Sequence, residues 1–270
     1  MKKFITIVGF IIIPILFGRL MISCSTVPLT GRHQLNLLPE SELMAMGITQ
    51  YDEFLKENRL SSDQNATRMV KKVGNKIAQA VEAYLKENGM SDRIAGYKWE
   101  FNLVENEVPN AWCMPGGKVV VYTGILPVTQ DENGLAVVLG HEISHAVARH
   151  GNERMSQSLL IQMGGIALST AIDQKPEETK ALFMTAYGVG TAVGISLPYS
   201  RAQETEADKL GLIFMAMANY DPHGAIEFWQ RMANTGGQKP PEFLSTHPAD
   251  ETRVRNLENF LPEALKYYQP

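Results

Sequence analysis

The chain has 270 residues, of which 44% are hydrophobic and 20% charged, and its net charge is −4. This length and apolar content allow one large domain or two small ones with a sizeable core. The slightly acidic balance and the lack of any long basic run argue against a nucleic-acid-binding protein. Two cysteines are too few for a disulfide framework.

The N-terminus has the pattern of an export signal. Two lysines precede an apolar stretch, residues 4–17, and a small residue directly precedes Cys24. This arrangement resembles a bacterial lipoprotein processing site and predicts a signal peptide over residues 1–23, with lipid attached to Cys24. The alternative is an uncleaved anchor helix, since residues 4–23 form a stretch just long enough to span a bilayer.

The residues after Cys24 predict where the mature protein would reside. Ser25 stands where an aspartate would indicate retention at the inner membrane, so we expect a periplasmic protein of a Gram-negative bacterium, lipid-anchored at the outer membrane. Residues 24–39 contain two prolines and a glycine without clear periodicity, which is typical of a tether. Residues 40–270 are then predicted to form a single domain.

Two helices and two strands are predicted in the first half of that domain. Apolar residues recur at helical spacing from Glu40 to Asn58 and, more strongly, from Asp63 to Asn88. Residues 99–103 alternate apolar and polar, and residues 119–122 are β-branched after a glycine turn, so both predict strands. The stretch Thr129–Glu132 matches a capping box that would open the next helix.

After His150 the chain is predicted to be helical to its end, with a Pro- and Gly-rich loop over residues 235–248 and a last helix over residues 249–260. Residues 159–172 and 181–197 are apolar and rich in small residues. We favour two buried, closely packed helices over membrane insertion or a mobile lid, because neither stretch is long enough for a clear membrane span. A small sheet with many helices predicts an α+β fold that is mostly helical.

The stretch His141–His145 is an HExxH motif within apolar, helix-compatible sequence. Residues four apart share one face of a helix, so the imidazoles of His141 and His145 can face a single ion. Glu142 can reach a water molecule held by that ion. The motif therefore predicts a zinc hydrolase that needs at least one further ligand.

The candidates for the third ligand are His150, His223, His247 and the many carboxylates further along the chain. His150 comes five residues after His145, which rotates it away from the ligand face of the same helix. Glu204 and Asp208 lie four apart, so Glu204 could bind zinc while Asp208 accepts a hydrogen bond from a liganding histidine. The alternative is that these carboxylates form a solvated acidic face.

Several motifs together resemble a known family, the zinc peptidases related to HtpX, the CAAX prenyl proteases, and the periplasmic (BepA/LoiP-like) and mitochondrial quality-control peptidases. The motifs are His141–His145, Arg149-His150, Glu204–Asp208, Ser245–Pro248, and Asn110–Trp112 followed by Pro115–Gly117. The resemblance extends from about Pro28 to Leu261, and the lipidated or periplasmic members are the most similar in layout. It implies a zincin-like (gluzincin) fold with a small sheet beside the HExxH helix.

The resemblance also implies roles for individual residues. It assigns one zinc ion to His141, His145 and Glu204, the role of general base to Glu142, and hydrogen-bond support to Asp208. It further implies that the strand that includes Gly116, Gly117 and Val119 borders the cleft, where an extended peptide could pair with an edge.

His247 precedes a proline in the predicted loop, and the resemblance suggests that it approaches the metal. It would then fill a fourth zinc position and silence the enzyme, or stabilise the oxyanion during turnover. The alternative is a loop histidine that bonds Asp250 or Arg253. Arg201 and Arg253 could pair with carboxylates near the site, but we take them as surface arginines.

The sequence thus predicts a zinc metalloendopeptidase of the bacterial cell envelope that cleaves misfolded or unassembled envelope proteins in extended conformation. One alternative is a zinc-stabilised chaperone or assembly factor for outer-membrane proteins in which proteolysis is secondary. Another is an intramembrane prenyl-peptide protease, against which the shortage of long apolar spans argues. A nucleic-acid partner is not expected.

Overall fold

The computed structural model describes residues 24–192, 196–235, 247 and 251–269. The predicted signal peptide and most of the predicted loop over residues 235–248 lie outside these residues. The chain divides into two compact units, one of Met1–Glu40 with Gly151–Ser196 and a larger one of Ser41–His150 with Leu197–Pro270. The predicted boundaries of signal, tether and domain stay predictions.

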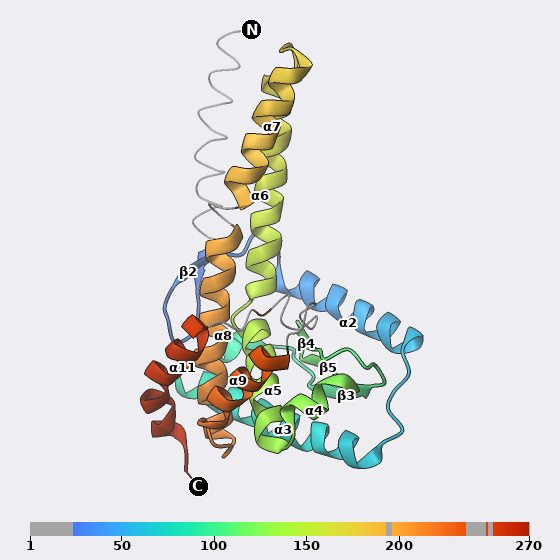
Figure 1. Cartoon of the computed structure of the whole chain (residues 1–270), viewed down its shortest axis with the longest axis vertical. Coiled ribbons are helices and arrows are strands. Elements are labelled where there is room, and N and C mark those ends of the chain that lie inside the picture. The colour runs from blue at the N-terminus through green and yellow to red at the C-terminus, as the bar shows by residue number, and fades with distance from the viewer. Residues whose placement is uncertain (1–23, 193–195, 236–246, 248–250, 270) are drawn as a thin grey trace. The chain divides into compact units, whose positions relative to one another are not determined.

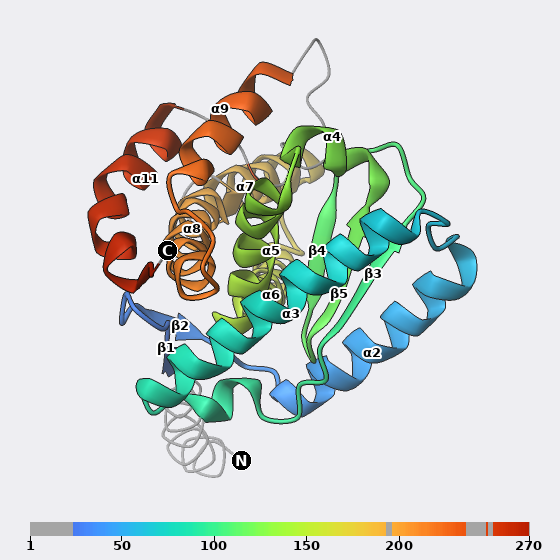
Figure 2. The ribbon, with the colours of Figure 1, turned by 90° about the horizontal axis from the view of Figure 1, so that it is seen from below.

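The larger unit consists of a small sheet and a set of helices (Figure 2). Its elements in chain order are α2 (Glu40–Glu57), α3 (Gln64–Glu87), β3 (Glu100–Val104), β4 (Ala111–Met114), β5 (Lys118–Tyr122), α4 (Leu126–Thr129), α5 (Glu132–Val147), α8 (Leu197–Met217), α9 (Gly224–Thr235) and α11 (Glu251–Ala264). Short 3₁₀ turns over Ser91–Ile94, Thr123–Ile125 and Leu265–Tyr267 join or end them. This confirms the predicted α+β, mostly helical fold and the zincin-like arrangement of a small sheet with the HExxH helix.

The sheet has the strand order β3-β5-β4, with β3 parallel and β4 antiparallel to β5. Strand β5 is therefore central, which its sequence explains: Val119, Val120 and Val121 are all fully buried, so both faces of the strand are covered. Tyr51 of α2 packs with Val120 on one face. The prediction that Val119 lies on an edge strand is wrong, because Phe101 and Cys113 flank it on both sides.

The glycines before β5 are also paired within the sheet region. Gly116 and Gly117 have φ values of 94° and 80°, which favour glycine and form the turn from β4 into β5. Their carbonyl oxygens accept hydrogen bonds from the amides of Lys98 and Glu100. The predicted substrate edge at Gly116 and Gly117 is therefore wrong, and the edge on this side of the sheet is β4, a strand that the sequence did not predict.

Helix α5 carries the HExxH motif and lies between the sheet and α8 (Figure 2). It begins after Asp131, whose side chain accepts a hydrogen bond from the amide of Gly134. The predicted capping box at Thr129 is therefore wrong, because the Thr129 hydroxyl donates to the carbonyl of Leu126 within α4. The residues of α5 from Gly134 to Val147 are all buried, so the motif lies inside the unit.

A close approach of α5 and α8 depends on two glycines. A Cβ atom on Gly140 would lie 2.9 Å from the carbonyl oxygen of Gly211, and one on Gly211 would lie 3.0 Å from the amide nitrogen of His141. Real Cβ contacts are almost never this short, so larger side chains would separate the helices. The glycine pair thus lets α8 bring its carboxylates close to the motif.

The smaller unit contains β1 (Cys24–Thr26) and β2 (His33–Leu35), paired antiparallel within the predicted tether, together with most of α6 (His150–Ala171) and α7 (Glu177–Thr191). Helices α6 and α7 run side by side (Figure 1), and the hydroxyl of Tyr187 donates to the carbonyl of Ile161 at 2.7 Å. The guanidinium of Arg32 forms two hydrogen bonds with the Glu153 carboxylate, which joins the β1–β2 segment to α6.

The α6–α7 pair exposes much of its apolar surface. Ile166 is 66% and Leu182 is 68% exposed, and α7 has no buried residue. The preferred interpretation of residues 159–172 and 181–197 as buried helices is therefore wrong for the residues described, since small residues let the pair pack closely without covering its outer faces. None of the helices in the described ranges combines the length and hydropathy needed to cross a bilayer.

Candidate metal centre

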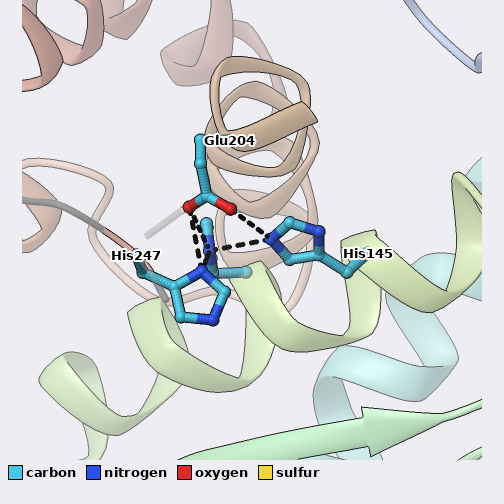
Figure 3. Close-up of side chains that lie close together, drawn as sticks. His145, Glu204 and His247 are labelled. Atoms are coloured by element: carbon cyan, nitrogen blue, oxygen red, sulfur yellow. Dashed lines mark hydrogen bonds and ion pairs between the residues drawn. The ribbon is translucent and has the colours of Figure 1, made fainter. Parts of the chain in front are cut away.

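Four side chains from three parts of the larger unit converge at one point (Figure 3). His141 and His145 project from one face of α5 with their Nε2 atoms 3.1 Å apart. Glu204 of α8 places Oε2 3.3 Å from His141 Nε2 and Oε1 3.3 Å from His145 Nε2. The Nδ1 atom of His247 lies 2.9 Å from Glu204 Oε2 and 3.1 Å from His141 Nε2.

This donor set fits a metal cation. One potential ligand atom from each of the four residues lies within 4.8 Å of the others. Neighbouring ligand atoms around a tetrahedral zinc ion, at roughly 2.0–2.2 Å from it, lie roughly 3.3–3.5 Å apart. The nitrogens of His141, His145 and His247 face one another and one carboxylate, and a central cation would satisfy all these lone pairs together. Imidazole nitrogen and carboxylate oxygen are ligands that zinc accepts.

The electrostatics of the cluster favour positive charge at its centre. Burial alone would raise the pKa of Glu204, but hydrogen bonds from His141, His145 and His247 hold it far below its usual value. Burial alone would lower the pKa of His141, but hydrogen bonds with the Asp208 and Glu204 carboxylates raise it to about 9. The carboxylates that favour a proton on His141 would favour a metal cation in the same way.

Glu142 lies beside the four-donor cluster and is buried, with 4% of its surface exposed. Its Oε1 atom has no hydrogen-bond partner within the described part of the chain and lies 3.5 Å from His247 Nε2. Burial raises the pKa of this carboxyl group. A buried carboxylate oxygen that lacks a donor costs stability, and such atoms often mark a site where water or substrate binds.

Behind His141 lies a carboxylate clamped by an arginine. Asp208 Oδ1 is 2.9 Å from His141 Nδ1, and the Arg253 guanidinium donates to both Asp208 oxygens at 2.8 and 2.6 Å. Arg253 also lies 3.3 Å from the ring centroid of Trp229 and 3.3 Å from Glu204 Oε2. Burial would raise the pKa of Asp208, but Arg253 and His141 lower it, so the group is a carboxylate next to His141.

Behind His145 lies a second histidine instead of a carboxylate. His150 Nδ1 is 2.9 Å from His145 Nδ1, and His150 Nε2 is 3.1 Å from Glu206 Oε2. Burial lowers the pKa of His145 well below its usual value, although Glu204 opposes this. The two histidines of the motif therefore have different partners on the side away from the cluster.

Two further residues of this site, Arg253 and His150, lie behind the histidines of the motif. Arg253 is 6% exposed, so its interpretation as a surface arginine is wrong. The sequence pattern could have indicated that Arg253 is buried, because Arg253 and Leu257 lie four apart on the buried face of an amphipathic helix. His150 was set aside as a ligand because of its spacing from His145 on one helix, but the chain turns at Arg149 and His150 contacts Nδ1 of that residue, which no sequence signal showed.

Comparisons with known proteins agree with this geometry. The family model described as Peptidase family M48 matches residues 70–261. Mitochondrial metalloendopeptidase OMA1 of Schizosaccharomyces pombe is 34% identical over 88% of this chain and 66% of its own length, and the human protein of that name is 32% identical over 96% and 49%. The beta-barrel assembly-enhancing protease of Escherichia coli is 28% identical over 60% of this chain and 34% of its own length. The chain thus spans about half to two thirds of the length of these two mitochondrial relatives.

These relatives correct two predictions. The predicted role in the bacterial cell envelope, as a protease for misfolded envelope proteins or as an outer-membrane assembly factor, is wrong, because the relatives with the stronger matches are mitochondrial enzymes of eukaryotes. The predicted lipid-anchored, outer-membrane localisation in a Gram-negative bacterium is wrong for the same reason. These relatives give no support to a signal peptide or to lipid on Cys24.

The family match confirms the predicted class of enzyme, a metalloendopeptidase. It leaves open which branch, among those related to HtpX, the CAAX prenyl proteases and BepA, is the nearest. The match extends from within α3 to α11 and thus includes α5, α8 and all the residues of the larger unit that form the four-donor cluster. The chain is a member of peptidase family M48.

Proposed function

We propose that this protein is a zinc-dependent endopeptidase in which His141, His145 and Glu204 bind the ion and Glu142 is the general base. The observation that carries the proposal is the buried Oε1 atom of Glu142, which lacks a hydrogen-bond partner among the described residues and lies beside four metal-binding side chains. Asp208 holds His141 through its Nδ1 atom, which leaves Nε2 directed at the cluster.

The chemistry follows from these positions. A bound zinc ion supplies Lewis-acid activation, lowering the pKa of a bound water toward about 7 and polarising the scissile carbonyl. Glu142 takes a proton from the attacking water and passes it to the leaving amine, and its raised pKa suits both steps.

The outer edge of β4 is the proposed binding site for substrate. The amide of Tyr122 donates to the carbonyl of Asn110, so by antiparallel alternation Ala111 and Cys113 direct their backbone groups away from β5. Strand β4 contacts α5, and Glu142 helps to raise the pKa of the Cys113 thiol, second to burial, so the strand lies near the general base. An extended peptide that pairs with β4 would bring its backbone past Glu142. The substrates are therefore protein segments in extended conformation.

His247 is the proposed fourth donor. Its Nδ1 atom lies within 3.1 Å of both Glu204 Oε2 and His141 Nε2, and this position favours closing the ion's open site over stabilising an oxyanion. On this proposal the enzyme is active when His247 moves away from the cluster.

The general-base role is tested with Glu142→Gln. We expect the variant to keep its fold and its bound zinc and to lose cleavage of an unfolded protein such as casein, because the amide cannot accept the proton of water. Glu132→Gln, at the exposed start of the same helix, is the matched control and should cleave normally. Zinc content is measured by elemental analysis, and retained cleavage by the Glu142 variant would overturn the assignment.

A further inference from the structure

Two buried residues form a chain of hydrogen bonds behind His145 that the proposed mechanism does not use. His150 Nδ1 lies 2.9 Å from His145 Nδ1, and His150 Nε2 lies 3.1 Å from Glu206 Oε2. His150 is 0% and Glu206 is 4% exposed, so water does not replace these contacts. We refer to His150 and Glu206 together as the His150–Glu206 relay.

The backbone at Arg149 explains how His150 reaches His145. Arg149 has a φ of 62°, a left-handed conformation that ends the course of α5 before α6 begins at His150. This conformation is unfavourable for a residue other than glycine, so it persists only where the surrounding structure requires it. Here it turns His150 back toward α5, although the spacing of five residues would rotate it away on a continuous helix.

The direction of every proton in the relay follows from the chemistry of imidazole. A histidine that binds a cation through Nε2 and remains neutral carries its proton on Nδ1. His145 must then donate to His150, so Nδ1 of His150 is the acceptor and its proton is on Nε2. That proton is donated to Glu206, a carboxylate that only accepts. Only this order of donors and acceptors, from His145 through His150 to Glu206, leaves Nε2 of His145 free to bind a cation.

We propose that His150 is a positioning residue that holds His145 in the tautomer with its proton on Nδ1, so that Nε2 is free to bind the metal ion, while Glu206 fixes the tautomer of His150. This inference rests on the proposed function, since it requires a metal bound by His145. It differs from a packing role for His150 because it depends on an acceptor atom at the position of Nδ1 and not on the volume of the ring.

The test compares three variants of the full chain. His150→Leu removes the acceptor and keeps an apolar side chain of similar bulk. His150→Asn removes the ring but places an amide oxygen near the position of Nδ1. His223→Leu is the matched control, because His223 is exposed and bonds only Asp221 among the contacts described. For each variant we measure the affinity for Zn²⁺ by competition with a chelator, the visible absorption spectrum with Co²⁺, and the midpoint of thermal unfolding.

We expect His150→Leu to lower zinc affinity by about 10- to 100-fold and to alter the Co²⁺ spectrum, because partners that orient a liganding histidine have effects of this size. His150→Asn should recover most of the affinity, and His223→Leu should match the unchanged protein. Unchanged affinity and spectrum in a folded His150→Leu variant would overturn the inference, and so would an equal loss in the Leu and Asn variants.

The same experiment separates this inference from the proposed function. If His145→Ala does not reduce zinc binding by the otherwise unchanged chain, the proposed metal site itself is wrong, and the inference falls with it. If His145→Ala abolishes binding but His150→Leu leaves it unchanged, only the role of the relay is overturned.

Discussion

The two histidines of the HExxH motif share a helix but are held in different ways. Behind His141 a carboxylate makes direct contact, and Arg253 of α11, stacked on Trp229 of α9, clamps that carboxylate. Behind His145 the ring of His150 intervenes between the ligand and the carboxylate of Glu206. The pKa of His141 is accordingly raised to about 9, whereas that of His145 is lowered.

The two sides of the site differ in how close a carboxylate lies to the histidine that would bind the cation. The direct carboxylate gives His141 more electron density and the stronger attraction for a cation. The relay behind His145 keeps the buried carboxylate of Glu206 one residue away from the liganding ring, with His150 between them. The first arrangement depends on three elements distant in sequence, and the second begins with a residue only five positions away.

The largest effect is expected from removing the carboxylate behind His141. Asp208→Ala removes one of the two carboxylate partners of the buried Arg253, the other being Glu204, and breaking a buried pair in this way costs about 3–5 kcal/mol of unfolding free energy. Urea denaturation measures the loss, with Asp173→Ala, at an aspartate whose side chain is 70% exposed, as the control. A loss below about 1 kcal/mol would mean that Arg253 does not depend on Asp208.

A smaller effect is expected on the side of His145. Glu206→Leu removes the hydrogen-bond acceptor of His150 Nε2 and leaves this buried N–H group without that partner, at a cost of about 1–3 kcal/mol. The same urea measurement applies, and Glu227→Leu, at a more exposed glutamate, serves for comparison. If Glu206→Leu destabilises as much as Asp208→Ala, the contrast between the two sides is lost.

The smallest effect on stability, with a distinct effect on activity, is expected at His247. His247→Ala should change unfolding free energy by about 1 kcal/mol or less, since its hydrogen-bond contacts with Glu204 and His141 are only partly buried. We expect peptide cleavage to increase, because the fourth donor no longer competes with water. A decrease of about 100-fold or more would instead assign His247 to the oxyanion, and unchanged cleavage and zinc content would exclude both roles.

Much of the secondary structure could be predicted because it depends on neighbouring residues. The predicted helices from Glu40 and Asp63 are confirmed as α2 and α3, since their apolar spacing follows the helical repeat. Strand β4 was missed because Ala111–Met114 has no alternating pattern, and its extended conformation is fixed by pairing with β5. The order of the strands could not be predicted either, since it depends on long-range pairing.

The candidate site likewise has a part that the local sequence specifies and a part that depends on how the helices pack. The local pattern of residues is enough to predict that His141, Glu142 and His145 lie on one helix. The spacing of four residues places the two histidines on a shared face of that helix, whatever surrounds it. The approach of Glu204 was suggested by resemblance, while its physical basis, the contact of Gly140 with Gly211, is visible only once α5 and α8 are packed.

The surroundings of His141 and His145 depend on tertiary packing. Arg253 is buried because α11 packs beside α8 and α9, and His150 meets His145 because one backbone turn at Arg149 departs from the helix. Local periodicity encodes which residues share a face, since it depends on the geometry of one helix. Which charges and hydrogen-bond partners meet that face depends on packing between distant segments, which no single stretch of sequence specifies.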